Sequence, residues 1–99
     1  MQTSRLHAVL FTKEACPPCA KTKEFAFDIL ENNLDLAEVL SFMKKENHSA
    51  LVETYSLSLF PTLLIVGPNG LEIQRFVGGK AVREVLEEKL IEIYRENNS

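Results

Sequence analysis

The sequence predicts a single α/β domain over residues 1–99, with a four-stranded mixed sheet flanked by three helices. The length of 99 residues is enough for one hydrophobic core and too short for a second one. Hydrophobic residues make up 45% of the chain and charged residues 25%, which is the balance of a folded globular domain. Apolar runs of strand length also alternate with segments of helical periodicity, in the order strand, helix, strand, helix, strand, strand, helix.

The first half of the chain predicts a strand, a helix and a second strand. Leu6–Phe11 is an almost unbroken apolar run, typical of a central strand that is covered on both faces. From Cys19 onward, apolar residues recur at helical spacing until Asn32–Asn33 ends the run. Leu34–Phe42 begins with alternating apolar and polar residues, which predicts the second strand. Such a unit crosses over in a right-handed sense, so the two strands should pair in parallel.

The second half predicts a short helix followed by a hairpin. Asn47 or Ser49 should cap a short helix that runs to about Tyr55. Pro61–Val66 and Leu71–Val77 have the composition of strands, and a Pro-Asn-Gly turn separates them. We therefore expect these two strands to pair antiparallel.

A final helix follows two glycines, Gly78 and Gly79. Between Val82 and Tyr94 the apolar residues fall on one helical face, which should pack on the sheet. Asn97–Ser99 predicts a frayed polar tail. The sequence contains no internal repeat, low-complexity tract or linker, which agrees with one domain.

Charge and hydropathy exclude several classes of partner. The net charge of −3 lacks the basic footprint that binding to a phosphate backbone requires. The longest apolar runs, Ala8–Phe11 and Leu63–Val66, are far shorter than the roughly 20 residues that cross a bilayer. Met1–Arg5 leads into the first strand without the long apolar stretch of a signal peptide. We therefore expect a cytoplasmic protein with no nucleic-acid or membrane partner.

The chemistry of the chain is concentrated in a Cys-Pro-Pro-Cys motif, formed by Cys16, Pro17, Pro18 and Cys19. Two cysteines three apart at the start of a helix can bring their sulfurs within bonding distance. A thiolate at this position also meets the helix dipole and unpaired N–H groups, which lower its pKa and make it a nucleophile. We expect Cys16 to attack a substrate disulfide, and the more buried Cys19 to resolve the mixed disulfide that forms.

Half of a zinc site is the other interpretation of a C-x-x-C motif. Zinc needs four ligands, and the chain has no second cysteine pair. His7 and His48 are the remaining nitrogen donors, and neither has metal-ligand spacing to the cysteines. The motif therefore favours redox chemistry, with no metal and no cofactor.

Three segments resemble the thioredoxin and glutaredoxin superfamily, from the first strand through the last helix. The first is Phe11–Cys19, where the motif follows an apolar strand. The second is Tyr55–Leu64, which is similar to the thioredoxin segment in which a cis-proline opens a strand. The third is the turn Gly67–Gly70, followed by Phe76–Gly79 before the last helix. The resemblance implies a thioredoxin fold and a short thioredoxin-like redoxin.

The resemblance also implies which residues form the site. Pro61 should be cis and should face the Cys16–Cys19 pair, while the backbone of Phe60 pairs with an extended substrate segment. Pro17 and Pro18 would complete this substrate-binding surface together with Gly78. A trans proline that merely starts a strand is the alternative for Pro61, and a plain turn into the helix is the alternative for Gly78.

The sequence departs from both branches of the superfamily. Leu10 stands where thioredoxins usually carry a buried acidic residue, and the chain has no tryptophan. The short N-terminus, the paired glycines and Lys13 are similar to glutaredoxins. However, Pro18 replaces the aromatic residue of the glutaredoxin motif, and Leu59–Pro61 replaces the usual threonine-containing tripeptide. The chain therefore combines features of thioredoxins and of glutaredoxins.

The double proline has a consequence for the reactivity of the nucleophile. Pro18 lacks the backbone N–H that could otherwise reach the Cys16 sulfur. We expect a thiol less acidic than in motifs with that N–H, and hence a protein that acts mainly as a reductant. Lys13 and Lys21 add positive charge that opposes this effect, and Glu14 offsets part of it. From the sequence alone, the net effect of these groups on the pKa of the Cys16 thiol could be in either direction.

The leading functional hypothesis is a small oxidoreductase that reduces disulfides in protein partners. The resemblance implies ribonucleotide reductase as one such partner and a flavin-dependent thioredoxin reductase as the electron source. Two alternatives stay open. The protein could be a glutaredoxin recycled by glutathione, or a redox-inert module that docks a protein through Phe60, Pro61 and the Pro-Pro loop.

Overall fold

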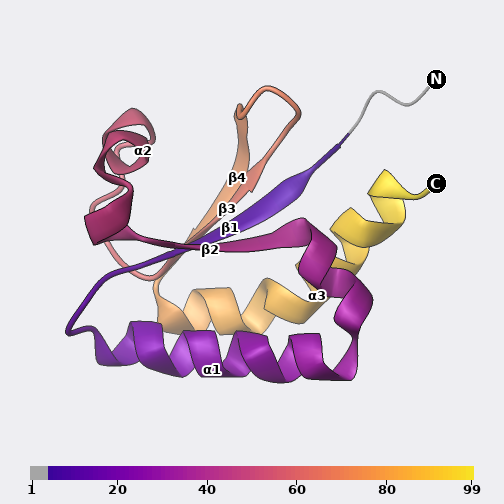
Figure 1. The fold of residues 1–99 in the computed structure, drawn as a ribbon, viewed down its shortest axis with the longest axis horizontal. Coiled ribbons are helices and arrows are strands. Elements are labelled where there is room, and N and C mark those ends of the chain that lie inside the picture. The colour runs from indigo at the N-terminus through magenta and orange to yellow at the C-terminus, as the bar shows by residue number, and fades with distance from the viewer. Residues whose placement is uncertain (1–4) are drawn as a thin grey trace.

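The computed structural model describes residues 5–99. The expectation that the N-terminus is not a signal peptide concerns residues that lie largely outside this range, at 1–4. One sheet has the strand order β2-β1-β3-β4 (Figure 1). The strands are β1 (His7–Thr12), β2 (Leu40–Lys44), β3 (Thr62–Val66) and β4 (Glu72–Val77). The α-helices are α1 (Pro17–Asn32), α2 (Ser49–Thr54) and α3 (Gly79–Asn97), and the 3-10 helices are η1 (Leu34–Val39) and η2 (Lys45–Asn47). This confirms the predicted fold class, a four-stranded mixed sheet with three α-helices.

Strand pairing makes the sheet mixed. β1 is parallel to β2 and antiparallel to β3, and β3 is antiparallel to β4. The parallel pair belongs to the strand–helix–strand unit of the first half, and the antiparallel β3–β4 pair is the predicted hairpin. Both predicted pairings are therefore confirmed.

The hydrophobic core occupies both faces of the sheet, because alternate residues of β1 point in opposite directions. Ala8 and Leu10 pack with buried residues of α1, η1 and α3. Val9 and Phe11 pack on the other face with Leu57 and with partly buried residues of α2. Figure 1 shows α1 and α3 side by side along the first face, with α2 set apart from them. The prediction that β1 is a central strand covered on both faces is confirmed.

The strand predicted over Leu34–Phe42 is partly wrong. Its first six residues form the 3-10 helix η1, and β2 begins only at Leu40. Leu36 and Val39 are the buried residues of η1, and their spacing of three matches one turn of a 3-10 helix. The apolar alternation at the start of this segment therefore reflected a short helix that packs against α3.

The predicted helix boundaries are also corrected by the structure. α1 begins at Pro17 rather than at Cys19, because the fixed φ of proline suits the first turn of a helix. Neither Asn47 nor Ser49 caps α2, since His48 occupies that position without a side-chain capping bond.

The predicted frayed tail is wrong for Asn97, which ends α3 and contacts the other end of the chain. Its side-chain amide donates to the carbonyl of Leu6, and its side-chain carbonyl accepts from the N–H of Leu6, both at 2.9 Å. These two hydrogen bonds pair the backbone of Leu6, just before β1, in the way that a neighbouring strand would. The contact fixes the start of β1 to the end of α3.

Within residues 5–99, no helix is long and apolar enough to cross a membrane.

Replacing Asn97 by alanine should destabilise the protein by about 1–2 kcal/mol, because two hydrogen bonds to a partly buried backbone are lost. Urea denaturation followed by circular dichroism measures this change. Asn98→Ala is the matched control, since its side chain donates to the carbonyl of Tyr94 in its own helix. Equal losses in the two variants would show that the contact with Leu6 contributes nothing specific.

Candidate functional site

The two cysteines form a disulfide at the point where β1 leads into α1. The Cα atoms of Cys16 and Cys19 are 5.2 Å apart. Cys16 is half-buried, whereas Cys19 is only 2% exposed. The sulfur nearer the loop is therefore the accessible one, as expected from the sequence.

Cys16 occupies the N-cap position of α1, and its sulfur serves as the capping group. The N–H of Cys19 donates to Cys16 Sγ over 3.2 Å. Pro17 and Pro18 fill the first two helical positions, where neither has an N–H to offer. The N–H of Cys19 is therefore the first backbone donor in the helix that the sulfur can use. This geometry supports the expectation that Pro18 removes a donor from the nucleophile.

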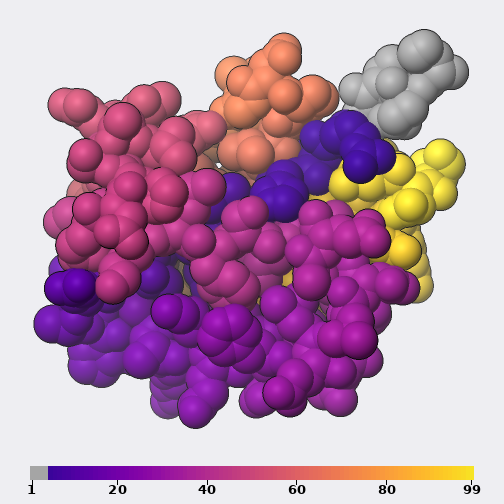
Figure 2. Space-filling view, viewed as in Figure 1, coloured from indigo at the N-terminus to yellow at the C-terminus, as the bar shows by residue number. Residues whose placement is uncertain are grey.

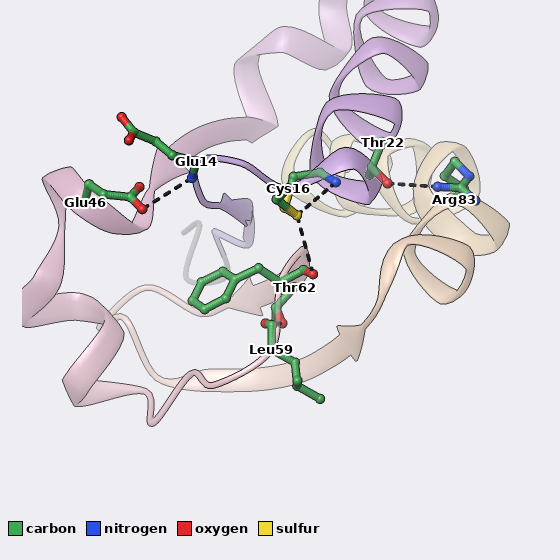
Figure 3. The surroundings of a disulfide bond; sticks show 9 residues. Glu14, Cys16, Thr22, Glu46, Leu59, Thr62 and Arg83 are labelled. Atoms are coloured by element: carbon green, nitrogen blue, oxygen red, sulfur yellow. Dashed lines mark hydrogen bonds between the residues drawn. A yellow bond between two sulfur atoms is a disulfide. The ribbon is translucent and has the colours of Figure 1, made fainter.

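The segment before β3 lies across from the cysteine pair (Figure 3). The Phe60–Pro61 peptide bond is cis, and the carbonyl oxygen of Phe60 is 3.9 Å from Cys16 Sγ. The sulfur of a disulfide carries no proton, so this contact can become a hydrogen bond only when Cys16 is a reduced thiol. The expectation that Pro61 is cis and near the cysteines is confirmed.

Two glycines join this segment to α3. Gly78 donates its N–H to the carbonyl of Pro61 over 2.8 Å, and its φ of +99° lies in a region that favours glycine. A Cβ on Gly79 would lie 3.4 Å from Cβ of Pro18 and 2.9 Å from Nη1 of Arg83. Gly78 is therefore favoured by its backbone conformation, since an added Cβ would meet no atom within 4 Å, and Gly79 allows the close packing of α3 against the site. A role of Gly78 in substrate binding remains a prediction.

The site residues predicted from the sequence are thus gathered at one end of the sheet. Cys16, Cys19, Phe60 and Pro61 lie together, and Gly78 is bonded to Pro61. Pro17 and Pro18 are exposed beside them.

Sequence reasoning missed a charged cluster beside the cysteines, which comes from the end of β2 and from η2. Lys44 Nζ is 3.2 Å from Glu14 Oε2, and the N–H of Glu14 donates to Glu46 Oε2 over 3.3 Å. Lys45 Nζ lies 5.7 Å from the ring centroid of Phe60. Figure 2 shows the indigo segment around the start of α1 adjoining the magenta region of η2 and α2. The parallel pairing of β1 with β2 was the one signal that could have placed these residues here.

The pKa of the exposed Glu46 carboxyl is lowered below its ordinary value. Desolvation alone would raise this pKa, but two backbone N–H groups and the charges of Lys44 and Lys45 outweigh it. The carboxylate is therefore kept ionised where it binds the loop that precedes Cys16.

Among the described residues, the interior beneath the disulfide contains no acidic side chain. Leu10 is fully buried and pairs with Leu63 on β3. In the described part of the chain, the buried polar side chains are Thr12, Thr22 and Thr62, and none is acidic. Among these residues, no other element supplies the buried acidic side chain that thioredoxins usually carry at the position of Leu10.

Neither histidine lies in a metal-binding cluster. His7 Nε2 is 2.8 Å from Ser41 Oγ, a contact between β1 and β2, and His48 stands before α2. Among residues 5–99, no group of three or more metal-ligating side chains is close enough to hold an ion.

A disulfide at a helix start, opposite a cis-proline at the end of such a sheet, defines a thiol–disulfide oxidoreductase of the thioredoxin-fold class. The family model described as a thioredoxin-like domain matches residues 1–92. The chain therefore belongs to the thioredoxin-like family.

Solved structures agree with this fold. The thioredoxin Mala s 13 of Malassezia sympodialis is 18% identical with a TM-score of 0.71, over 94% of this chain and 78% of that one. The germline-specific Drosophila melanogaster thioredoxin Deadhead is 16% identical with a TM-score of 0.69, over 90% and 81% of the two chains. Fasciola hepatica thioredoxin is 25% identical with a TM-score of 0.62, over 93% and 81%. No curated protein matches the sequence significantly.

Pro18→Ala should lower the pKa of the reduced Cys16 thiol, because alanine supplies an N–H at a helical position that can reach an N-cap side chain. The rate of alkylation by iodoacetamide, measured against pH in a variant background of Cys19→Ser, should then rise at lower pH. Pro17→Ala is the control, since the first helical N–H is not one that a capping side chain normally accepts from. An unchanged pH midpoint in Pro18→Ala would contradict the assignment.

Proposed function

We propose that this protein reduces disulfides in other proteins by dithiol exchange. One observation carries the proposal. The half-buried sulfur of Cys16 lies between the N–H of Cys19 and the carbonyl of Phe60, and its partner Cys19 is buried behind it. A nucleophile at the surface and a resolving thiol within bonding distance are what this reaction requires.

The reaction starts from the reduced protein and moves one electron pair. The Cys16 thiolate attacks one sulfur of the substrate disulfide, forms a mixed disulfide, and releases a substrate thiolate that takes a proton from water. The Cys19 thiol then loses its proton and attacks Cys16 Sγ. The second substrate thiolate leaves and is protonated, so the substrate gains two electrons and the protein holds the Cys16–Cys19 disulfide.

Proton transfer from Cys19 is the step that the apolar interior affects most. With Leu10 in the place of an acid, no buried carboxylate among the described residues can accept this proton. Cys19 lines an open pocket together with Cys16, so solvent can reach the region. We infer that water or buffer takes the proton of Cys19.

The substrate would approach along the segment at Phe60 and Pro61. Pro17 and Pro18 are exposed on one side of the disulfide, and Leu59, which is 64% exposed, lies on the other. An extended segment could pair with the backbone of Phe60 while its side chains contact these apolar groups.

The substrates and the electron source are proposed on the resemblance to the family. Disulfides of protein partners, with ribonucleotide reductase among them, would be the substrates, and a thioredoxin reductase would return the electrons. The reaction consumes reducing equivalents, so we place the protein in the cytoplasm, where thiols are kept reduced.

Cys16→Ser should abolish the reduction of insulin disulfides, because the attacking sulfur is lost. Cys19→Ser should also stop turnover and should accumulate a covalent mixed disulfide with insulin, since nothing resolves it. Precipitation of reduced insulin measures turnover, and mass spectrometry detects the adduct. A wild-type protein that reduces no insulin would instead identify a redox-inert binding module.

Coupled reduction distinguishes the electron sources. A thioredoxin reductase should oxidise NADPH as it reduces the Cys16–Cys19 disulfide of this protein. Glutathione reductase should oxidise NADPH more slowly when glutathione is the direct reductant, because Leu59–Pro61 and Pro18 depart from the glutaredoxin pattern. The reverse order of rates would show that the protein is a glutaredoxin.

A further inference from the structure

The surface at the disulfide has the opposite charge to the chain as a whole. The protein carries a net charge of −3. An open pocket of about 200 Å³ at Cys16 is nevertheless lined by Lys13, Lys23 and Lys44, with Glu14 as its single acidic side chain. The side chains that line this pocket therefore carry a net positive charge.

Glu14 does not cancel this charge, because Lys44 already pairs with it at 3.2 Å. Neither Lys13 nor Lys23 takes part in the ion pairs found among residues 5–99. Close by, Lys45 Nζ lies over the ring of Phe60, and the positive charge of Lys45 is one of the causes that lower the pKa of Glu46. Of the three lysines that line the pocket, Lys13 and Lys23 are thus the two outside any ion pair found among residues 5–99.

The excess negative charge lies at the other end of the molecule. α3 starts beside the beginning of α1 and runs to the C-terminus at the opposite end (Figure 1). Its outer surface there carries Glu87, Glu88 and Glu92 beside Arg95, and Lys89 pairs with Glu92 at 3.3 Å. The charges of the protein are therefore separated between a basic disulfide end and an acidic distal end.

We propose that the protein substrate presents carboxylates next to its reactive disulfide, on an acidic segment that meets Lys13 and Lys23. This inference rests on the proposed function and adds the chemistry of the partner. Exposed charges attract within about 8 Å at physiological salt, and complementary charge raises the rate of encounter more than the final affinity. A protein segment suits the site because the exposed Leu59 extends the contact surface beyond the charged pocket.

Three synthetic peptides test the proposal. Each has the same intramolecular disulfide, flanked by glutamate, glutamine or lysine residues. The reduced protein is mixed with each peptide at low ionic strength, and acid-quenched samples give the rate of peptide reduction. The glutamate peptide should react about 2- to 20-fold faster than the lysine peptide, since each exposed charge pair contributes about 1.5- to 5-fold. Added salt should reduce this ratio towards one.

The double variant Lys13→Gln with Lys23→Gln should bring the glutamate-to-lysine ratio close to one. Loss of these lysines also changes the acidity of the thiol, but that change affects all three peptides alike and cancels in the ratio. Arg95→Gln removes one positive charge at the distal end and should leave the ratio as it is in the wild type.

The outcomes separate the two proposals. Equal rates for the three peptides, or a ratio that the double variant leaves unchanged, would overturn the charge inference while the proposed reductase stands. No reduction of the glutamine peptide by the wild type would overturn the proposed function itself. Glutathione disulfide is tested as a fourth substrate. The protein-segment proposal would be overturned if only glutathione disulfide were reduced faster than the glutamine peptide and only its rate fell in the double variant. The acidic group would then belong to glutathione.

Discussion

The hydrogen-bond register of β1 with its neighbours is the constraint on which the site depends. Phe11 pairs with Thr62, and Thr12 pairs with Lys44. The loop after β1 therefore lies beside both the segment before β3 and the segment after β2. Thr62 pairs in turn with Val77, which brings the glycines before α3 to the same end. A shift of β1 by one residue would also turn its apolar side chains to the wrong faces, so the core and the site share one register.

At this end of the sheet, the helix start supplies the chemistry. A sulfur at an N-cap position meets a backbone N–H and the positive end of the helix dipole, both of which favour a thiolate. The two prolines reduce this stabilisation by removing N–H groups, and they also start the helix at once, so that Cys19 comes round to face Cys16. The same motif therefore gives a fixed sulfur geometry and a limited set of donors.

The surroundings of the pair divide into an interior without acidic side chains, among the described residues, and a charged rim. Leu10 stands in the interior where thioredoxins usually carry an acid, and in the proposed reaction the protons are therefore exchanged with solvent. The rim is controlled by β2 and η2, where Glu46 holds the loop before Cys16 through the N–H of Glu14. In the proposed function, charge and exposed apolar surface at the rim are the features that a partner would meet.

The sequence alone determined most of the fold and which two residues form the cysteine pair. Apolar runs and helical periodicity predicted α1, α3, β1, β3 and β4, because burial of apolar side chains selects them, whereas β2 was predicted too early and α2 was predicted from cap residues that do not cap it. The C-x-x-C motif at a strand–helix junction identified the pair Cys16 and Cys19. Only the tertiary structure showed which distant segments of the chain contact one another. The 3-10 helix η1 and the bond between Asn97 and Leu6 arise from contacts between distant segments. The cluster of Lys44, Lys45 and Glu46 does so as well, and no local pattern can encode a contact whose partner lies thirty or more residues away.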